Sequence, residues 1–179
     1  MTVPAFSRKE LLSGLMIQRA IVPCTVSAAG TVNTYSASPQ PAAGLDLWDS
    51  GATDFRNLVI VVDVASVSTT GSLAVTLRDS GSAITTANGA ASTTEAFSMT
   101  AITAAGLYTC EVRLTHIFPS TSARVVASAT ADQVRRYISL RAAATDADFV
   151  MSAWFLLGNQ FGGFISQDAT ALTASWNNA

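Results

Sequence analysis

Charged residues are scarce in this chain. Asp, Glu, Lys and Arg make up 12% of its 179 residues, about half the usual share of roughly 25%. Lys9 is the only lysine and the net charge is −2. Sequence-independent binding of nucleic acid needs a basic stripe, so this composition argues against a nucleic-acid partner. A surface this poor in charge suits a protein that is covered within an assembly.

The sequence also has no long apolar run and no cysteines with the spacing of a metal-binding motif. No run of eighteen apolar residues exists, and the N-terminus lacks the apolar core of a signal peptide. We therefore expect no membrane partner and synthesis in a reducing compartment without export by a recognisable signal. The two cysteines, Cys24 and Cys110, have no metal-finger spacing. A pair is possible, but buried free thiols are the simpler interpretation.

Residues for catalysis are few. His116 is the only histidine, and no nucleophile-elbow motif accompanies it. Two carboxylate pairs lie close in sequence, Asp46 with Asp49 and Asp146 with Asp148. Both fall at strand ends or turns, where solvated loop carboxylates are the rule. We therefore predict that the chain is not an enzyme and has no catalytic residues.

Ligand-binding patterns are equally weak. Asp46, Asp49 and Asp54 could gather around a calcium ion, but their spacing is not that of an EF-hand. The glycines at 158, 162 and 163 lack the Lys-Ser/Thr of a phosphate-binding loop. Four aromatic residues could form a sugar-binding platform, although packing explains aromatics more often: Trp48, Tyr35, Tyr108 and Trp176. We predict no metal and no cofactor.

The strongest pattern that is present spans residues 134–159. Two runs of alternating apolar residues flank a short polar link at 143–148. Period-two runs rich in aromatic and β-branched residues, joined by such a link, predict a β-hairpin. The second run is apolar on nearly both faces, which predicts a central strand covered on two sides.

Further strands are expected along residues 21–158, with turn signals about every ten residues, as in all-β sandwiches. Ala28-Ala29-Gly30 resembles a hairpin turn in which Gly30 supplies a positive φ. In Gly71–Arg78, Leu73, Val75 and Leu77 are expected to point inward, and the strand ends in an Asp79-Ser80-Gly81 turn. The other expected segments are strands at 31–36, 45–49, 55–67, 95–102, 107–114 and 124–128, and a long exposed excursion at 82–94.

The two ends differ from this sandwich. Ser7 and Glu10 match a capping box, and the apolar residues that follow share one helical face, so residues 1–20 are interpreted as an arm with a short helix from Arg8 to about Arg19. Residues 159–179 are interpreted as an extended tail that packs on its own sandwich or on a neighbour. The residues expected to make interfaces are Phe6, Leu11, Leu12, Leu15, Met16, Phe161, Phe164, Ile165 and Trp176.

Three stretches resemble a known family. They are GSLAVTLRDSG at 71–81, AGLY at 105–108, and RYISLRA at 136–142 followed by residues 149–158. Their order and spacing resemble the small capsid decoration, or cement, proteins of tailed bacteriophages. The resemblance covers about residues 55–159 and excludes both ends, and the loop after Asp79 lacks the acidic and Trp-containing continuation often found in the family.

The resemblance implies a jelly-roll-like antiparallel β-sandwich that binds the outer surface of a capsid and stabilises it by bridging subunits. It also implies the major capsid protein as partner, a homo-trimer, location in the virion, and synthesis in the bacterial cytoplasm. Two other interpretations stay open. One is a carbohydrate-binding or adhesin module of a tail or fibre, and the other is a tail-tube subunit that polymerises in rings.

Overall fold

The computed structural model describes residues 15–36, 39–47, 57–89, 93–113, 116–118, 133–158 and 174–176. Its regular elements are strands, in chain order β1 (Leu15–Val26), β2 (Thr31–Asn33), β3 (Leu45–Asp46), β4 (Asn57–Val67), β5 (Ser72–Ser80), β6 (Thr94–Ser98), β7 (Gly106–Arg113), β8 (His116–Phe118), β9 (Gln133–Arg135), β10 (Tyr137–Thr145), β11 (Phe149–Gly158) and β12 (Ala174–Trp176). The predicted all-β class is confirmed.

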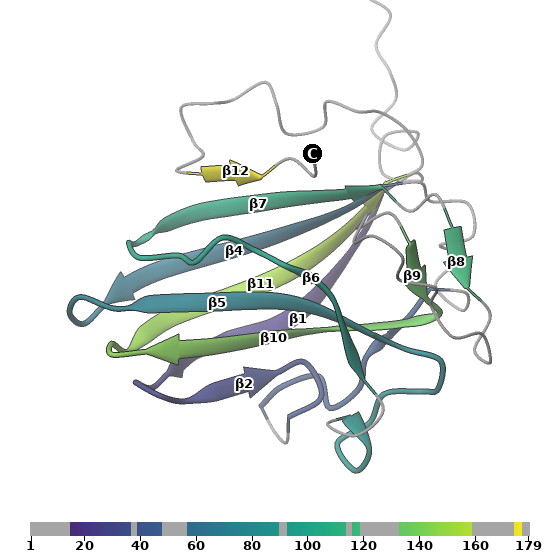
Figure 1. The fold of residues 1–179 in the computed structure, drawn as a ribbon, viewed down its shortest axis with the longest axis horizontal. Helices are drawn as coiled ribbons and strands as arrows, with labels where there is room; N and C mark the ends of the chain where they lie inside the picture. The colour runs from purple at the N-terminus through teal and green to yellow at the C-terminus, as the bar shows by residue number, and fades with distance from the viewer. Residues whose placement is uncertain are drawn as a thin grey trace, which may run out of the picture.

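The strands form two packed sheets (Figure 1). Sheet A has the order β1-β11-β4-β7-β12, and sheet B has the order β2-β10-β5-β6 with β3 beside β10. The short strands β8 and β9 form a separate parallel pair. Within the two sheets all pairings are antiparallel except that of β12 with β7. The chain is therefore a β-sandwich, as its turn spacing predicts.

The pairings are nested along the chain. The first long strand, β1, pairs with the late strand β11, and inside this pair β2 pairs with β10, β4 with β7, and β5 with β6. Rolling up such a ladder brings β11 against β4 and β10 against β5, and both of these pairings are present. This is the arrangement of a jelly roll, which agrees with the fold that the family resemblance implies.

The two expected hairpins are wrong, although their strands are present. β10 lies in sheet B and β11 in sheet A, and β1 and β2 are likewise in different sheets. The polar links at 146–148 and 27–30 therefore cross from one sheet to the other. Each strand pairs with partners far away in the sequence, because only that arrangement buries the inward faces of both sheets together.

These crossings gather at one end of the sandwich, on the left in Figure 1. Asp148 holds three of them together. Its Oδ1 accepts the Ala28 N–H at 2.7 Å, its own N–H donates to Ser68 Oγ at 2.9 Å, and its carbonyl accepts the Ser68 N–H at 3.0 Å. The residues at 27–30, 68–71 and 146–148 consequently form one hydrogen-bonded cap.

Backbone geometry in this cap also differs from the prediction. The positive φ in the first link belongs to Ala29, at 59°, and not to Gly30. Gly30 is needed for a different reason: a Cβ there would lie 2.7 Å from the carbonyl oxygen of Ser27. At Gly71 an added Cβ would lie 2.5 Å from the Ala147 Cβ, so the links at 68–71 and 146–148 pack at backbone distance.

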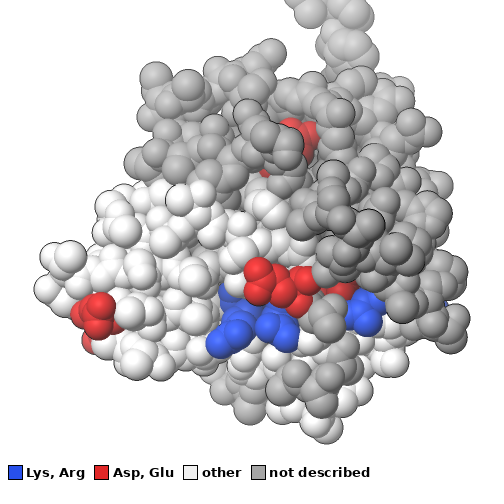
Figure 2. Space-filling view, in the orientation of Figure 1, with Lys and Arg blue, Asp and Glu red and all other residues white. Residues whose placement is uncertain are grey.

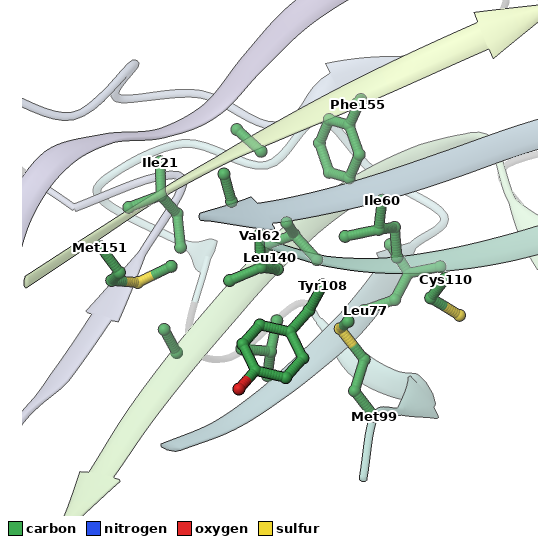
Figure 3. Packing of buried hydrophobic residues seen from close by; sticks show 14 of the residues in the cluster. Ile21, Ile60, Val62, Leu77, Met99, Tyr108, Cys110, Leu140, Met151 and Phe155 are labelled. Carbon is green, nitrogen blue, oxygen red and sulfur yellow. The ribbon is translucent and has the colours of Figure 1, made fainter. Parts of the chain in front are cut away.

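The core lies between the sheets and is almost wholly aliphatic and aromatic (Figure 3). The inward residues alternate along each strand, as in Leu58, Ile60, Val62 and Val64 of β4. β5 follows the same rule, because Leu73, Val75 and Leu77 are buried in the core as predicted. β11 is central in sheet A, as predicted, and its inward set runs from Phe149 to Leu157.

The expected helix at 8–19 is wrong for its last five residues. Residues 15–19 belong to β1 and pair with β11 from Leu15 opposite Gly158 onward. An isolated helix of three turns is only marginally stable in water. Pairing with the buried strand β11 gives the same backbone N–H and C=O groups their hydrogen bonds. Residues 8–14 of that expected helix lie outside the described part of the chain.

Asp79 does not close a turn, as was expected from the Asp-Ser-Gly sequence. β5 continues to Ser80, and the Asp79 side chain is fully buried, with 0% of it exposed. Its Oδ1 accepts bonds from Arg135 Nε at 3.0 Å and Nη2 at 2.9 Å, and its Oδ2 accepts the Arg135 N–H at 3.0 Å. This pair fastens the segment before β10 to β5.

A second, more exposed pair stands beside it. Arg136 reaches both carboxylate oxygens of Asp46, at 2.9 and 2.6 Å, and its guanidinium lies 5.0 Å from the centre of the Tyr137 ring. Arg135 and Arg136 are thus ion-paired with Asp79 and Asp46, respectively. The two pairs allow a matched comparison.

We predict that Arg135→Ala lowers the free energy of unfolding by about 3 kcal/mol, because it leaves the Asp79 carboxylate buried without its charge partner. Arg136→Ala is the control and should cost about 1 kcal/mol, since both members of its pair keep some exposure to water. Urea-induced unfolding of both variants measures the difference. Equal losses in the two variants would contradict this ranking.

Candidate interaction surface

The outward face of sheet A is unusual because it carries large apolar side chains. Its outward positions follow from the alternation with buried residues in each strand. The outer face of sheet A, as used below, consists of Ile17 and Arg19 of β1, Val150, Ser152, Trp154 and Leu156 of β11, Val59, Val61 and Asp63 of β4, and Leu107, Thr109 and Glu111 of β7.

Two residues of this face stand out by exposure. Ile17 is 60% exposed and Val150 is 39% exposed, and these are the exposed large hydrophobic side chains among the described residues. Both point outward from the same sheet, on the adjacent strands β1 and β11. They are not neighbours, however: Ile17 lies opposite Leu156 and Val150 lies opposite Thr25, so the two are about 20 Å apart along the strands.

Cross-strand pairing joins the apolar residues into rows. Ile17 lies opposite Leu156, which lies opposite Val59. In the next row Trp154 lies opposite Val61, and it lies beside Leu156 along β11. Trp154, Leu156 and Val61 are half-buried, so part of each remains available for contact. Val59, Ser152 and Thr109 of the same face are buried, with 7%, 6% and 4% exposed. The expectation that β11 is covered on two sides holds for Ser152 on its outer side, is met in part at Trp154 and Leu156, and is wrong at Val150, which is exposed.

Three charged side chains also lie on this face. Arg19 is exposed on β1, opposite Trp154, while Glu111 on β7 and Asp63 on β4 are half-buried on the other side. None of these three forms an ion pair with another residue that the structure describes. The face thus combines apolar side chains with one positive charge on the edge strand β1 and two negative charges on the inner strands β4 and β7.

The outer face of sheet B provides the contrast. Its outward residues on β5 are Ser72, Ala74, Thr76 and Arg78, and those on β10 include Ser139, Arg141 and Thr145. These are small, polar or charged, as expected of a sheet face that meets water, although Ser139 and Thr76 are themselves buried. The view in Figure 2 likewise shows a mostly uncharged surface, with one mixed group of basic and acidic side chains near its centre.

The interface residues expected from the sequence are only partly placed. Leu15 and Met16 lie in β1, two positions or fewer from Ile17, and Trp176 lies in β12, opposite Cys110. Phe6, Leu11, Leu12, Phe161, Phe164 and Ile165 lie outside the described residues. Ile17, Val150 and Trp154 were missed, because in the sequence they look like ordinary members of buried strands.

Among the described residues, none of the chemical sites considered from the sequence is assembled. Among the described residues no cluster of three or more His, Cys, Asp or Glu side chains could hold a metal ion. Asp46 is engaged with Arg136, and Asp49 and Asp54 lie outside the described residues. Tyr35 and Tyr108, two members of the possible sugar platform, are buried and offer no exposed ring. His116 lies in β8, paired with Gln133.

Both cysteines are free thiols. Cys24 lies on β1 and Cys110 on β7, with β11 and β4 between them. That separation is about 14 Å across the sheet, too far for a disulfide. Burial raises the pKa of Cys24, against a smaller opposite effect of its hydrogen bond with Gln40, and it raises the pKa of Cys110 to about 12, with a further contribution from Glu111.

Comparison with known proteins adds no identity: the chain matches no family model, no curated protein and no solved structure. Within the part of the chain that the structure describes, no helix is long and apolar enough to cross a membrane.

We predict that Cys110 resists alkylation in the folded protein. With a pKa of about 12, roughly one thiol in ten thousand is ionised at pH 8, and the thiolate is the reactive form. Cys24, which is less buried, should react first. Iodoacetamide labelling followed by peptide mass spectrometry gives the order, and labelling in urea should make both react. Faster reaction of Cys110 in the native protein would contradict the burial described above.

Proposed function

We propose that this chain is a structural virion protein that binds the outer surface of a capsid and stabilises it by bridging subunits. The single observation that carries the proposal is the apolar outer face of sheet A, with Ile17 and Val150 exposed. In a protein that stays alone in water such a face lowers solubility, whereas in an assembly it is covered.

The rest of the molecule is consistent with a role in binding rather than in chemistry. A cement protein gains its affinity from several contacts of modest area, multiplied by the number of copies. The weakly charged surface, with 12% charged residues in the chain, lowers the cost of removing water from each contact. The jelly roll supplies two rigid sheets that can present such contacts, and capsid proteins are among the proteins built on this fold.

The partner in this proposal is the major capsid protein. The fold by itself does not select it, since jelly rolls also carry lectin and enzyme functions. What supports it is the family resemblance over residues 55–159, together with an exposed apolar sheet face that needs a protein partner. No nucleic acid or membrane is needed.

Immunogold labelling of purified particles tests the proposal directly. An antibody to this chain should place gold evenly over the heads, because a cement protein occupies equivalent sites over the whole shell. Labelling confined to tails or fibres would overturn the capsid role in favour of adhesion or tube assembly. Particles without label would remove the virion role altogether.

We further predict that the N-terminal arm contributes to this attachment. The arm must be taken as residues 2–14, because β1 begins at Leu15 and a longer deletion would remove sheet A's first strand. Particles assembled with the truncated chain should carry fewer copies, measured by quantitative gel densitometry. The urea midpoint of the truncated protein should stay unchanged, and full occupancy would refute a role for the arm.

A further inference from the structure

We propose that Asn88 is a site of spontaneous deamidation, and that the segment 82–89 protects it for as long as this segment stays closed against residues 42–44. The inference concerns a chemical modification and does not depend on the virion role. It rests on the sequence pair Asn88-Gly89 and on the hydrogen bonds that hold this pair.

The sequence pair combines a reactive residue with the neighbour that favours its reaction. Asn88 is the only asparagine of the chain that precedes a glycine. Asparagine is a thermolabile residue, and a following glycine favours its deamidation because no side chain obstructs attack by the glycine nitrogen. A Cβ at Gly89 would lie 2.4 Å from Cδ2 of the Tyr35 ring. Packing against Tyr35 therefore requires the very residue that makes Asn88 reactive.

The reaction consumes only water. The Gly89 backbone nitrogen, after losing its proton, attacks Asn88 Cγ and forms a new N–C bond that closes a cyclic imide. The Cγ–Nδ2 bond breaks, and Nδ2 takes up a proton and leaves as ammonia. Water then opens the imide at one of its two carbonyl groups, which yields either aspartate or isoaspartate at position 88.

The folded chain opposes the first of these steps. The Gly89 N–H donates to the Thr85 carbonyl oxygen at 2.8 Å. Asn88 Oδ1 accepts the Thr85 N–H at 2.9 Å and the Thr85 hydroxyl at 3.0 Å, and Asn88 Nδ2 donates to the Ala83 carbonyl oxygen at 3.0 Å. Attack on Cγ needs a free Gly89 nitrogen and a side chain that has turned out of these bonds. Deamidation therefore requires the segment to open.

The closure of the segment depends on a few bonds to residues 42–44. The Ile84 carbonyl oxygen accepts the Gly44 N–H at 2.9 Å, and Thr86 Oγ1 donates to the Ala42 carbonyl oxygen at 3.2 Å. Ile84 is buried, whereas Asn88 is exposed. A surface segment held by so few bonds opens more often than the core strands do. The rate of deamidation in the folded protein is then the rate in the open chain multiplied by the fraction of open molecules.

The products cannot restore the original closed arrangement. An aspartate has no N–H for the Ala83 carbonyl oxygen, and its carboxylate would face that oxygen instead. An isoaspartate lengthens the main chain by one methylene group directly before Gly89, which packs on the Tyr35 ring without room for a further carbon. Deamidation therefore acts in one direction, since each molecule that reacts loses bonds of the closed segment.

Peptide mass spectrometry of the full chain, aged in mildly alkaline buffer with and without urea, tests the proposal. Trypsin releases residues 79–113, in which Asn88 is the only asparagine and no glutamine occurs, so any conversion of amide to acid in this peptide belongs to Asn88. The peptide should deamidate readily in urea, and roughly tenfold or more slowly in the folded protein, because the segment is closed there most of the time.

Thr85→Ala measures the contribution of the contact itself. It removes the hydroxyl that donates to Asn88 Oδ1 and keeps the backbone of the turn. Deamidation of the folded protein should become about fivefold faster, the factor that corresponds to the typical net contribution of one hydrogen bond. The rate in urea should stay the same. Thr25→Ala is the matched control, because Thr25 is also an exposed threonine but lies on β1, and it should change neither rate.

Asn88→Asp reproduces one product and reports the effect on the segment. Hydrogen exchange of the Gly44 N–H, which is bonded to Ile84, should become about fivefold faster or more in this variant. The Leu73 N–H, bonded to the Ile102 carbonyl oxygen at 2.8 Å, should exchange at its original rate and shows that the sandwich is intact.

Three results would overturn the proposal. Absence of deamidation in urea would remove the site, and equal rates in the folded protein and in urea would remove the protection. Equal effects of Thr85→Ala and Thr25→Ala in the folded protein would show that the bonds to Asn88 do not provide it. Each of these results is independent of immunogold labelling of particles.

Discussion

The pairing of β11 with both β1 and β4 is the constraint on which the rest of the structure depends. β11 lies between β1 and β4 for its whole length. The first long strand, β1, can therefore pair only after β11, one of the last strands, has been synthesised. This closure places the other pairs inside it: β2 with β10, β4 with β7, and β5 with β6. Most contacts are thus distant in sequence, and topologies of this kind fold slowly because long loops close before they are stabilised.

The same closure explains which parts of the fold the sequence could predict. The alternation of apolar residues locates strands and their inward faces, and it did so for Leu73, Val75 and Leu77. The alternation does not show which strand pairs with which. A link of three residues such as 146–148 suits a hairpin and an inter-sheet crossing equally well, and the choice depends on strands far away in the chain. Both hairpins were mispredicted for this reason.

Predictions from local sequence patterns were wrong where residues distant in the sequence provide the stronger interaction. The capping-box pattern at Ser7 and the apolar spacing after it favour a helix, yet residues 15–19 satisfy their backbone groups in the ladder to β11. An Asp-Ser-Gly sequence favours a turn, yet Asp79 is buried and receives its hydrogen bonds from Arg135, more than fifty residues away. In each case the partner that decides the structure is outside the window that a local pattern covers.

The candidate interaction surface was beyond sequence prediction for a related reason. Val150, Trp154 and Leu156 alternate with core residues of β11, and a strand that is apolar on both faces looks fully buried. Only the folded structure shows that nothing in the described part of the chain covers Ile17 and Val150. The interface residues predicted from the sequence lie instead at the two ends of the chain. Of these, only Leu15 and Met16 lie next to Ile17 in β1.

The position of this surface on strands has an energetic consequence. Binding through loops costs conformational entropy, because side chains and backbone must be ordered at the interface. Here Ile17, Trp154 and Leu156 stand on strands whose backbone is already fixed by antiparallel ladders. Binding at this face therefore needs no further ordering of the backbone, although rigid-body and side-chain freedom are still lost. A small face on a rigid sheet can thus support an assembly in which each contact is weak and the copies are many.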